Sequence, residues 1–294
     1  MSPAYTVAIR RRVVNRLATV IITVCFLAAL VPLASLLFTV VSRGLARLDP
    51  TFFTWSMRGV VGEGGGAIHA IVGTALITLA AVIISVPIGV GTAIYLVEYG
   101  RGPLPRLIRY LTDVMTGIPS IVAGLFAYAL IVMFVGPGAR SGIAGAIALS
   151  LLMIPVVIKS SEEMLVLVPD DLREAATALG AVKSKTVSLV VVPTALSGIV
   201  AGVMLGVCRI IGETAPLLLV AGFTDSLNRD LFSQRMASLP VYIYSQWSNK
   251  GANQAAYDNR AWTAALVLIA IVLIFNLAAR AIAYFFSPRT SAQR

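Results

Sequence analysis

The amino-acid sequence predicts an all-α polytopic membrane protein with about six transmembrane helices. Of its 294 residues, 58% are hydrophobic and 12% are charged, and the mean hydropathy is +0.90. Soluble domains carry about 25% charged residues. A transmembrane helix needs about 20 mainly apolar residues, and apolar runs near that length recur along the chain, separated by shorter polar segments. These observations exclude an ordinary soluble domain.

The first predicted span covers residues 17–41. It follows four arginines, Arg10, Arg11, Arg12 and Arg16. A basic flank before an apolar run is also typical of a signal peptide, but this run exceeds the usual apolar core of about 7–15 residues. We therefore expect an uncleaved helix, with Leu33-Ala34-Ser35 keeping cleavage open as the alternative. Residues 1–67 then comprise a tail, this helix and a glycine-rich outer loop predicted to be flexible.

Five further apolar runs predict a membrane core at residues 68–286, before a tail at 287–294. The runs cover residues 68–97, 117–135, 142–158, 189–223 and 262–286. Pro87 interrupts the first of them, which indicates a helix that faces the bundle interior, because freed backbone groups need partners there. Between runs we expect a basic surface elbow at 98–116 and an outer connector at 224–261.

The distribution of Lys and Arg predicts the orientation. With the N-terminus in the cytoplasm, 14 of the 23 Lys and Arg residues fall in cytoplasmic segments, eight in outer segments, and Arg209 within a span. An excess of positive charge marks the cytoplasmic side, so both termini and the polar insert at 159–190 are expected there. The net charge of +10 is explained by attraction to anionic membrane lipid. No nucleic-acid partner is expected.

A short polar helix-turn-helix is predicted inside the insert. Asp171 is expected to cap its first helix, with Glu174 reaching back as in a capping box, and Gly180 is expected to end it. Four small or apolar residues at i, i+3, i+4 and i+7 form one face that another surface could approach closely. They are Leu172, Ala175, Ala176 and Leu179.

The insert resembles the cytoplasmic EAA loop of bacterial ABC-importer permeases, with the pattern EAA-x3-G-x9-I-x-L-P. Here Glu174-Ala175-Ala176 precedes Gly180, and Val190, Val192 and Pro193 follow at the same spacing, with Val in place of Ile and Leu. In that family the loop contacts a separate ATPase subunit. The resemblance implies a coupling loop formed by Asp171, Glu174, Ala175, Ala176, Leu179 and Gly180. From the local pattern alone, a solvated amphipathic turn is the alternative.

Arg209 and Glu213 form a charged pair within a predicted span. An arginine at mid-membrane costs about 3 kcal/mol on insertion scales, so an interior or wet setting is expected. At 100° per residue both lie within about 80° of helix surface shared with Gly198, Gly202, Gly206 and Pro216. Glycines four apart allow close helix packing, so we expect this helix at a pore against a partner subunit. The alternative is a structural ion pair.

An arginine in a pore suits an oxyanion, because its planar fork offers paired donors. Residues 209–216 (Arg-Ile-Ile-Gly-Glu-Thr-Ala-Pro), 116–125 and 239–244 resemble the A-type (PstA-type) permease of bacterial phosphate ABC importers, a likeness that runs from about residue 68 onward. The resemblance implies a type I ABC-importer (MetI-like) fold in the bacterial inner membrane, and a role for Arg209 and Glu213 in the substrate pathway. The implied partners are phosphate, a homologous second permease, two copies of a cytoplasmic ABC ATPase, and an extracytoplasmic phosphate-binding protein.

The sequence does not predict an enzyme. No Gly-x4-Gly-Lys-Ser/Thr pattern occurs, so ATP binding by a Walker A loop is not expected of this chain. No cofactor is expected, and Glu162, Glu163, Asp170 and Asp171 stand beside Lys and Arg as a solvated acidic rim rather than a metal site. The alternatives are a permease for another oxyanion such as sulfate or molybdate, and a secondary anion transporter. The latter normally shows an internal repeat, which we do not find.

Overall fold

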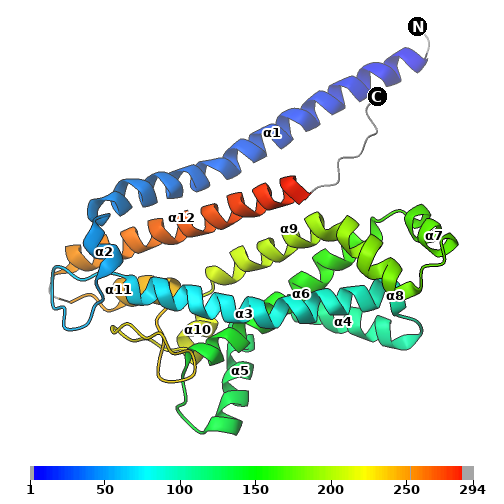
Figure 1. Ribbon diagram of the computed structural model, residues 1–294. Coiled ribbons are helices and arrows are strands. Elements are labelled where there is room, and N and C mark those ends of the chain that lie inside the picture. The colour runs from blue at the N-terminus through cyan, green and yellow to red at the C-terminus, as the bar shows by residue number, and fades with distance from the viewer. Residues whose placement is uncertain (1–2, 252, 287–294) are drawn as a thin grey trace.

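The computed structural model describes residues 3–251 and 253–286, and all regular secondary structure in these ranges is helical. Its long helices run lengthwise through the molecule at different tilts (Figure 1). They are α1 (Pro3–Gly44), α3 (Ile68–Ile94), α6 (Gly142–Val166), α9 (Val192–Ile211) and α12 (Gln254–Phe286). The predicted all-α class is therefore confirmed. The tail predicted at 287–294 lies outside the described residues.

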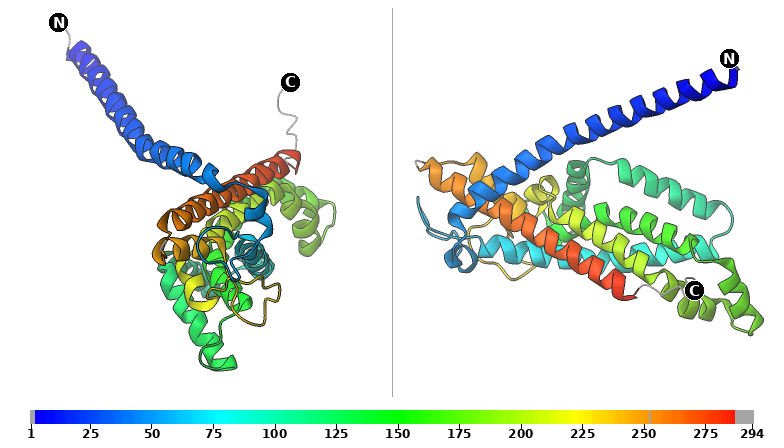
Figure 2. Two further views of the ribbon diagram at one scale, coloured as in Figure 1. Left: turned by 90° about the vertical axis from the view of Figure 1, so that its left-hand side faces the viewer. Right: turned by 90° about the horizontal axis from the view of Figure 1, so that it is seen from above.

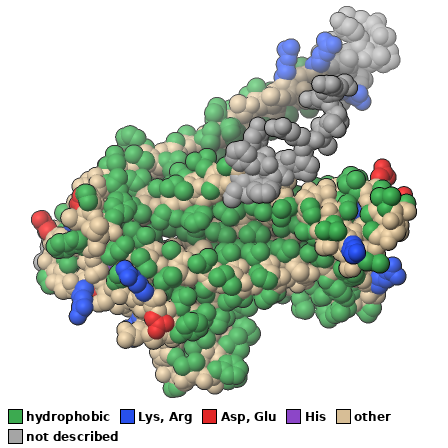
Figure 3. Space-filling view, viewed as in Figure 1, with side chains coloured by type: hydrophobic (Ala, Val, Ile, Leu, Met, Phe, Trp, Pro, Cys, Tyr) green, Lys and Arg blue, Asp and Glu red, His purple; other side chains and the backbone are tan. Residues whose placement is uncertain are grey.

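Five described helical segments are long and apolar enough to cross a membrane, and a sixth crossing is a broken pair of helices. The pair consists of α4 (Pro103–Gly117) and α5 (Ser120–Val135), whose axes differ by 109°. Counted as one span, the pair gives the six predicted. Hydrophobic side chains cover the middle of the bundle, and charged side chains gather toward its two ends (Figure 3).

Helix α4 forms most of the segment that the sequence predicts as a basic surface elbow at 98–116. Pro103 occupies the first turn, where a proline is preorganised for a helix and its missing N–H costs nothing. Ile118 is extended before Pro119, as residues before proline tend to be, and α4 ends there. Two ion pairs fix α4 to α6: Arg109–Glu162 at 2.6 Å and Lys159–Asp113 at 2.7 Å.

Helix α6 is the centre of the bundle and packs against α3, α4, α5 and α9. The main core cluster joins Leu149, Met153 and Val157 of α6 to Ile77 of α3 and Ile210 of α9. Helix α1 contrasts with this. Among the side chains described from Arg11 onward, those of α1 are buried only near its C-terminal end, where Thr263 of α12 donates a hydrogen bond to the Gly44 carbonyl at 2.8 Å. The rest of the helix projects outward (Figure 2).

The glycine-rich connector, predicted to be flexible, is held by two guanidinium groups. Arg260 is fully buried and donates to Gln246 at 2.7 Å and to the Gly62 carbonyl at 2.6 Å. Arg47 donates to the carbonyls of Gly64 at 2.8 Å and Gly65 at 3.1 Å. Because Gly62, Gly64 and Gly65 offer their carbonyls to these donors without side chains in the way, the segment is ordered rather than loose.

Two short helices complete this end of the molecule. Asp49 caps α2 (Pro50–Thr54) by accepting from the Phe52 N–H at 2.9 Å, and the hydrogen bonds from Thr51 and Phe52 lower the pKa of Asp49. Helix α11 (Leu239–Ser248) packs against α12. This end lies opposite the one at which α7 (Asp170–Ala178) is found (Figure 1).

Gly73 is where α3 passes closest to the segment before α11, and Gly73→Ala is expected to destabilise the protein strongly. An alanine Cβ would lie 1.9 Å from the Ala237 carbonyl oxygen. Overpacking typically lowers the free energy of unfolding by about 1–3 kcal/mol, and a backbone carbonyl cannot change rotamer to relieve the clash as a side chain can. The thermal midpoint of the purified protein in detergent should fall. Gly91→Ala on the same helix is the matched control, because nothing lies within 4 Å of that position. Equal midpoints for both variants would contradict the packing described.

Candidate functional site

The EAA-like segment forms α7 and α8 (Lys183–Thr186), at the end of the molecule where α3 and α6 also finish (Figure 1). Its start differs from the prediction. Helix α7 begins at Asp170, its N-cap is Pro169, and no side chain caps it. Asp171 is thus inside the first turn, so the predicted capping box is wrong. The proline fixes the extended entry to the helix, and both aspartates sit where the helix dipole favours negative charge.

The end of α7 follows the sequence prediction at Gly180. This residue has a φ of +81°, in the left-handed region that glycine adopts easily. The Ala181 N–H donates to the Ala176 carbonyl at 3.0 Å, and the Gly180 N–H donates to the Thr177 carbonyl at 2.9 Å. These two bonds are the Schellman pattern, which satisfies the last carbonyls of a helix.

The apolar face predicted on α7 is divided between the protein and its surroundings. Ala176 is buried against the rest of the chain at 9% exposure, whereas Leu179 is 89% exposed. Leu172, Ala175 and Glu174 are exposed as well. Ala176 therefore packs α7 against the rest of the protein, and the other apolar side chains of this face are accessible to a partner.

Glu98 is the residue that fixes this segment to the membrane helices, and sequence reasoning missed it. It lies in the π-helical turn η2 (Tyr95–Tyr99) that prolongs α3, and its side chain is 2% exposed. The Arg173 guanidinium of α7 lies 3.0 Å from its Oε1. Lys183 of α8 pairs with its other oxygen. We call these three residues, Glu98, Arg173 and Lys183, the Glu98 clamp.

Arg173 also binds the end of α6. It donates to the carbonyls of Leu165, in the last turn of α6, at 3.0 Å and of Val168, two residues beyond that helix, at 2.6 Å. A single guanidinium thus connects α7 to both α3 and α6. Any displacement of α7 must either move these two helices or break charge-assisted hydrogen bonds, which are the stronger kind.

Arg209 and Glu213 do not share one helix, contrary to the expectation. Helix α9 ends at Ile211, Gly212 is its C-cap, and Glu213 lies in the turn before α10 (Ala215–Val220). Gly212 and Pro216 explain the break, since glycine favours helix ends and proline favours helix starts. Within the described residues no ion pair of 4.0 Å or less joins Arg209 and Glu213. The alternative of a structural ion pair is thus absent from this structure.

The three glycines of α9 pack against α6 of the same chain. A Cβ at Gly198 would lie 2.3 Å from the Met164 sulfur, one at Gly202 would lie 2.3 Å from the Ser160 hydroxyl, and one at Gly206 would lie 3.3 Å from Met153. The expectation that this face meets a partner subunit is therefore wrong. Glycine spacing indicates close approach, but it does not identify the neighbour. Arg209 lies outside that contact and is exposed.

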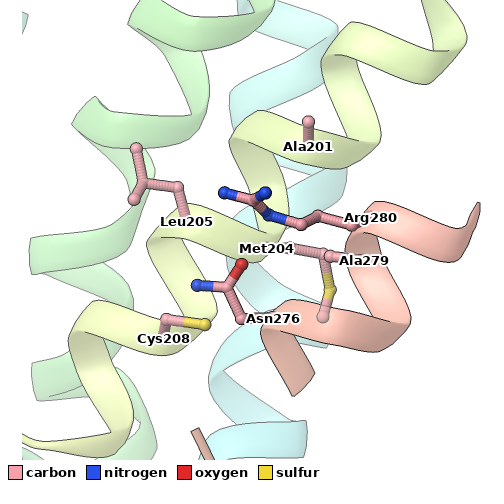
Figure 4. A pocket seen from close by; sticks show the side chains of 7 residues that line it. All are labelled: Ala201, Met204, Leu205, Cys208, Asn276, Ala279 and Arg280. Carbon is pink, nitrogen blue, oxygen red and sulfur yellow. The ribbon is translucent and has the colours of Figure 1, made fainter. Parts of the chain in front are cut away.

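A groove of about 340 Å³ separates α9 from the last part of α12. Its lining is Ala201, Met204, Leu205, Cys208, Asn276, Ala279 and Arg280. Arg280 and Asn276 extend from α12 toward α9 (Figure 4). From the sequence alone, Arg280 is only one of the cytoplasmic positive charges expected near the C-terminus. The structure places it, with Asn276 one turn earlier, beside the surface of α9 that carries Leu205 and Cys208.

Comparison with known families fits this architecture. Residues 85–292 match the model of the family described as "Binding-protein-dependent transport system inner membrane component". The chain belongs to this family. The protein is thus a multi-pass membrane component of a transport system, and this family membership gives no support to the secondary-transporter alternative.

Relatives within this transport family share much of the sequence. The "Phosphate transport system permease protein PstA 1" of Mycobacterium tuberculosis is 45% identical over 96% of this chain and 92% of its own length. The "Phosphate transport system permease protein PstA" of Yersinia pestis is 39% identical over 92% of this chain and 90% of its own. Members of the PstA group therefore resemble this chain along nearly its whole length.

Solved transporter structures share the fold of this inner membrane component. A chain of a bacterial alginate ABC transporter, in complex with an alginate-bound periplasmic protein, aligns with a TM-score of 0.63, 11% identity and coverage of 92% of this chain and 94% of that one. A chain of the inward-facing MetNI methionine ABC transporter aligns with a TM-score of 0.59, 18% identity and coverage of 75% and 96%. The predicted MetI-like permease fold is confirmed.

Proposed function

We propose that this chain is a permease subunit of an ATP-driven phosphate importer and forms half of the translocation pathway. The observation that carries the proposal is the 45% identity, over 96% of the chain, with a protein named as a phosphate transport system permease. The aligned region covers nearly the full length, so it includes the α7 segment and the break between α9 and α10. The proposed partners are a homologous second permease, two copies of a cytoplasmic ABC ATPase and an extracytoplasmic phosphate-binding protein.

In this proposal α7 docks on the ATPase in the cytoplasm and transmits its movement. Leu172, Ala175 and Leu179 offer the docking surface, since they are exposed apolar groups beside the exposed Glu174. The Glu98 clamp then carries the displacement into α3 and α6. The described ends of α1 and α12 lie toward the same end as α7 (Figure 1), as required if both termini are cytoplasmic. ATP hydrolysis belongs to the partner.

The proposed substrate pathway follows the exposed side of α9, with Arg209 and Glu213 as its charged groups. A guanidinium binds phosphate oxygens through paired donors. Glu213 lies in the turn just beyond the end of α9 and repels the anion, which keeps the affinity low enough for release. Asn276 and Arg280 line the groove beside the same helix. Sulfate and molybdate present similar tetrahedral oxygens to a guanidinium, so competition by these anions during uptake tests the choice of phosphate.

The proposal predicts that Glu174→Arg abolishes transport without loss of membrane insertion. Reversing a charge in a docking surface costs several kcal/mol when like charges meet, and each 1.4 kcal/mol is about tenfold in affinity. Uptake of labelled phosphate would be measured in a deletion strain complemented with each variant, with membrane abundance checked by immunoblot. Glu63→Arg is the control, because this exposed acid lies near α3's other end. Normal uptake by Glu174→Arg would refute coupling through α7.

A further inference from the structure

A polar depression of about 540 Å³ lies at the end of the molecule opposite α7. It is lined by Gly138, Ala139, Arg140, Phe223, Thr224, Gln234 and Arg235. These residues belong to the turn between α5 and α6 and to the loop after α10. That loop meets the first turn of α6, where the Ile143 N–H donates to the Leu231 carbonyl at 2.8 Å. Helix α6 then runs for about 35 Å, at 1.5 Å per residue, toward α7.

Two arginines from different segments come close together beside Gly222 in this depression. The Cδ atoms of Arg140 and Arg235 each lie 3.2 Å from where an alanine at Gly222 would place its Cβ. The two Cδ atoms are therefore separated by no more than about twice that distance. Both guanidinium groups can thus reach one small anion, and the Thr224 hydroxyl lines the same space.

Arg140 and Arg235 form no ion pair within the described part of the chain. Neither Arg140 nor Arg235 has a carboxylate oxygen within 4.0 Å there, whereas Lys250 at the same end pairs with Asp258 at 2.6 Å. Loops on the outer side of a membrane usually avoid positive charge. Two neighbouring unpaired arginines on that side therefore call for a ligand of negative charge.

The backbone beside Arg235 is strained. Gln234 has a φ of +61°, and it is the one non-glycine residue with a positive φ in residues 3–251 and 253–286. Such conformations cost free energy and cluster at functional sites. The strain turns the chain so that Arg235 approaches Gly222.

We propose that this depression is an oxyanion-binding site that receives phosphate before it enters the membrane pathway. The proposal rests on the function proposed above. Two planar guanidinium forks and a hydroxyl match the donors that phosphate prefers. Unscreened positive charge in a concave surface also raises the local concentration of anions. Helix α10, six residues or about 9 Å long, links Glu213 after α9 to Gly222 at the site.

Protection from an arginine reagent tests binding directly on the assembled importer. Phenylglyoxal modification would be followed by mass spectrometry at Arg140, Arg235 and the exposed control Arg58. Phosphate is expected to slow modification at Arg140 and Arg235 by up to about tenfold with one-site saturation, and to leave Arg58 unchanged. Chloride at equal ionic strength should protect neither. Equal protection of all three arginines, or of none, would overturn the proposal.

Transport by the Arg140→Gln/Arg235→Gln double variant distinguishes a small anion from a protein ligand. In proteoliposomes with the binding protein, uptake should fall by about a hundredfold or more, the loss expected from removing two charge-assisted hydrogen bonds. Stimulation of ATP hydrolysis by the binding protein should stay normal. Arg58→Gln, which removes one positive charge at an exposed position outside the depression, should leave both unchanged.

Two results would count against the site. Parallel loss of uptake and of ATPase stimulation would show that the arginines hold the binding protein instead, and unchanged uptake would show that they bind nothing needed for import. Failure of the unmodified importer to take up phosphate would refute the proposed function instead, and sulfate protection of Arg140 and Arg235 would then identify a different oxyanion.

Discussion

An importer that carries Glu98→Gln is expected to hydrolyse ATP at a near-normal rate while importing at least about tenfold less phosphate. The substitution keeps the size of the side chain but removes the negative charge with which both Arg173 and Lys183 form ion pairs. Breaking a buried ion pair by removing one partner typically costs about 3–5 kcal/mol. The exposed side of α7 is untouched, so docking of the ATPase should persist while the displacement no longer reaches α3.

The measurement is the ratio of phosphate imported to ATP hydrolysed in proteoliposomes. Glu163→Gln is the matched control, because it removes an exposed carboxylate from the last turn of α6 near the same loop. Joint loss of ATPase binding and transport would mean that Glu98 only folds the loop. An unchanged ratio would show that α7 acts through other contacts.

A double-mutant cycle measures how strongly Glu98 and Arg173 depend on each other for transport. Arg173→Met removes the guanidinium that joins Glu98 to the carbonyls of Leu165 and Val168. Residues in one hydrogen-bonded network show interaction energies of about 0.5–3 kcal/mol. If Glu98 and Arg173 act through one contact, phosphate import by Glu98→Gln/Arg173→Met should be little lower than import by Arg173→Met alone. In the control variant Glu163→Gln/Arg173→Met, the effects of the two substitutions on import should instead add.

The sequence predicts this fold well where a single segment carries its own signal. Apolar runs locate the long helices, and Gly180 marks the end of α7 through a conformation that other residues avoid. The helix break before Glu213 also has a local signal in Gly212 and Pro216, which the helical-face argument overlooked. The amphipathic α4 was missed because two prolines in its first turn were read as loop residues.

Contacts between distant segments could not be predicted in the same way. Glu98 and Arg173 are 75 residues apart, and neither position carries a pattern that names the other. Gly198, Gly202 and Gly206 indicate a close neighbour, but α6 and a partner subunit satisfy that spacing equally well. Arg140 and Arg235 come close together beside Gly222 only because the loop after α10 folds back onto the start of α6.

Arg209→Ala is expected to lower phosphate import by about a hundredfold or more, because two charge-assisted hydrogen bonds to the anion are lost at about 1.5–3 kcal/mol each. Arg209→Lys keeps the charge without the paired donors and should retain part of the activity. Arg58→Ala, which removes an exposed arginine outside α9, should import normally.

A substitution at Glu213 is expected to strengthen phosphate binding, whereas Arg209→Ala weakens it. Glu213→Gln removes the repulsion that keeps the anion loosely held, so phosphate should protect Arg209 from phenylglyoxal at lower concentrations than in the unmodified importer, while turnover falls. If Arg209 faced lipid instead, phosphate would not protect it, and Arg209→Ala would ease membrane insertion and leave import intact. Tighter binding with slower release is the combination that only a guanidinium lining the substrate pathway explains.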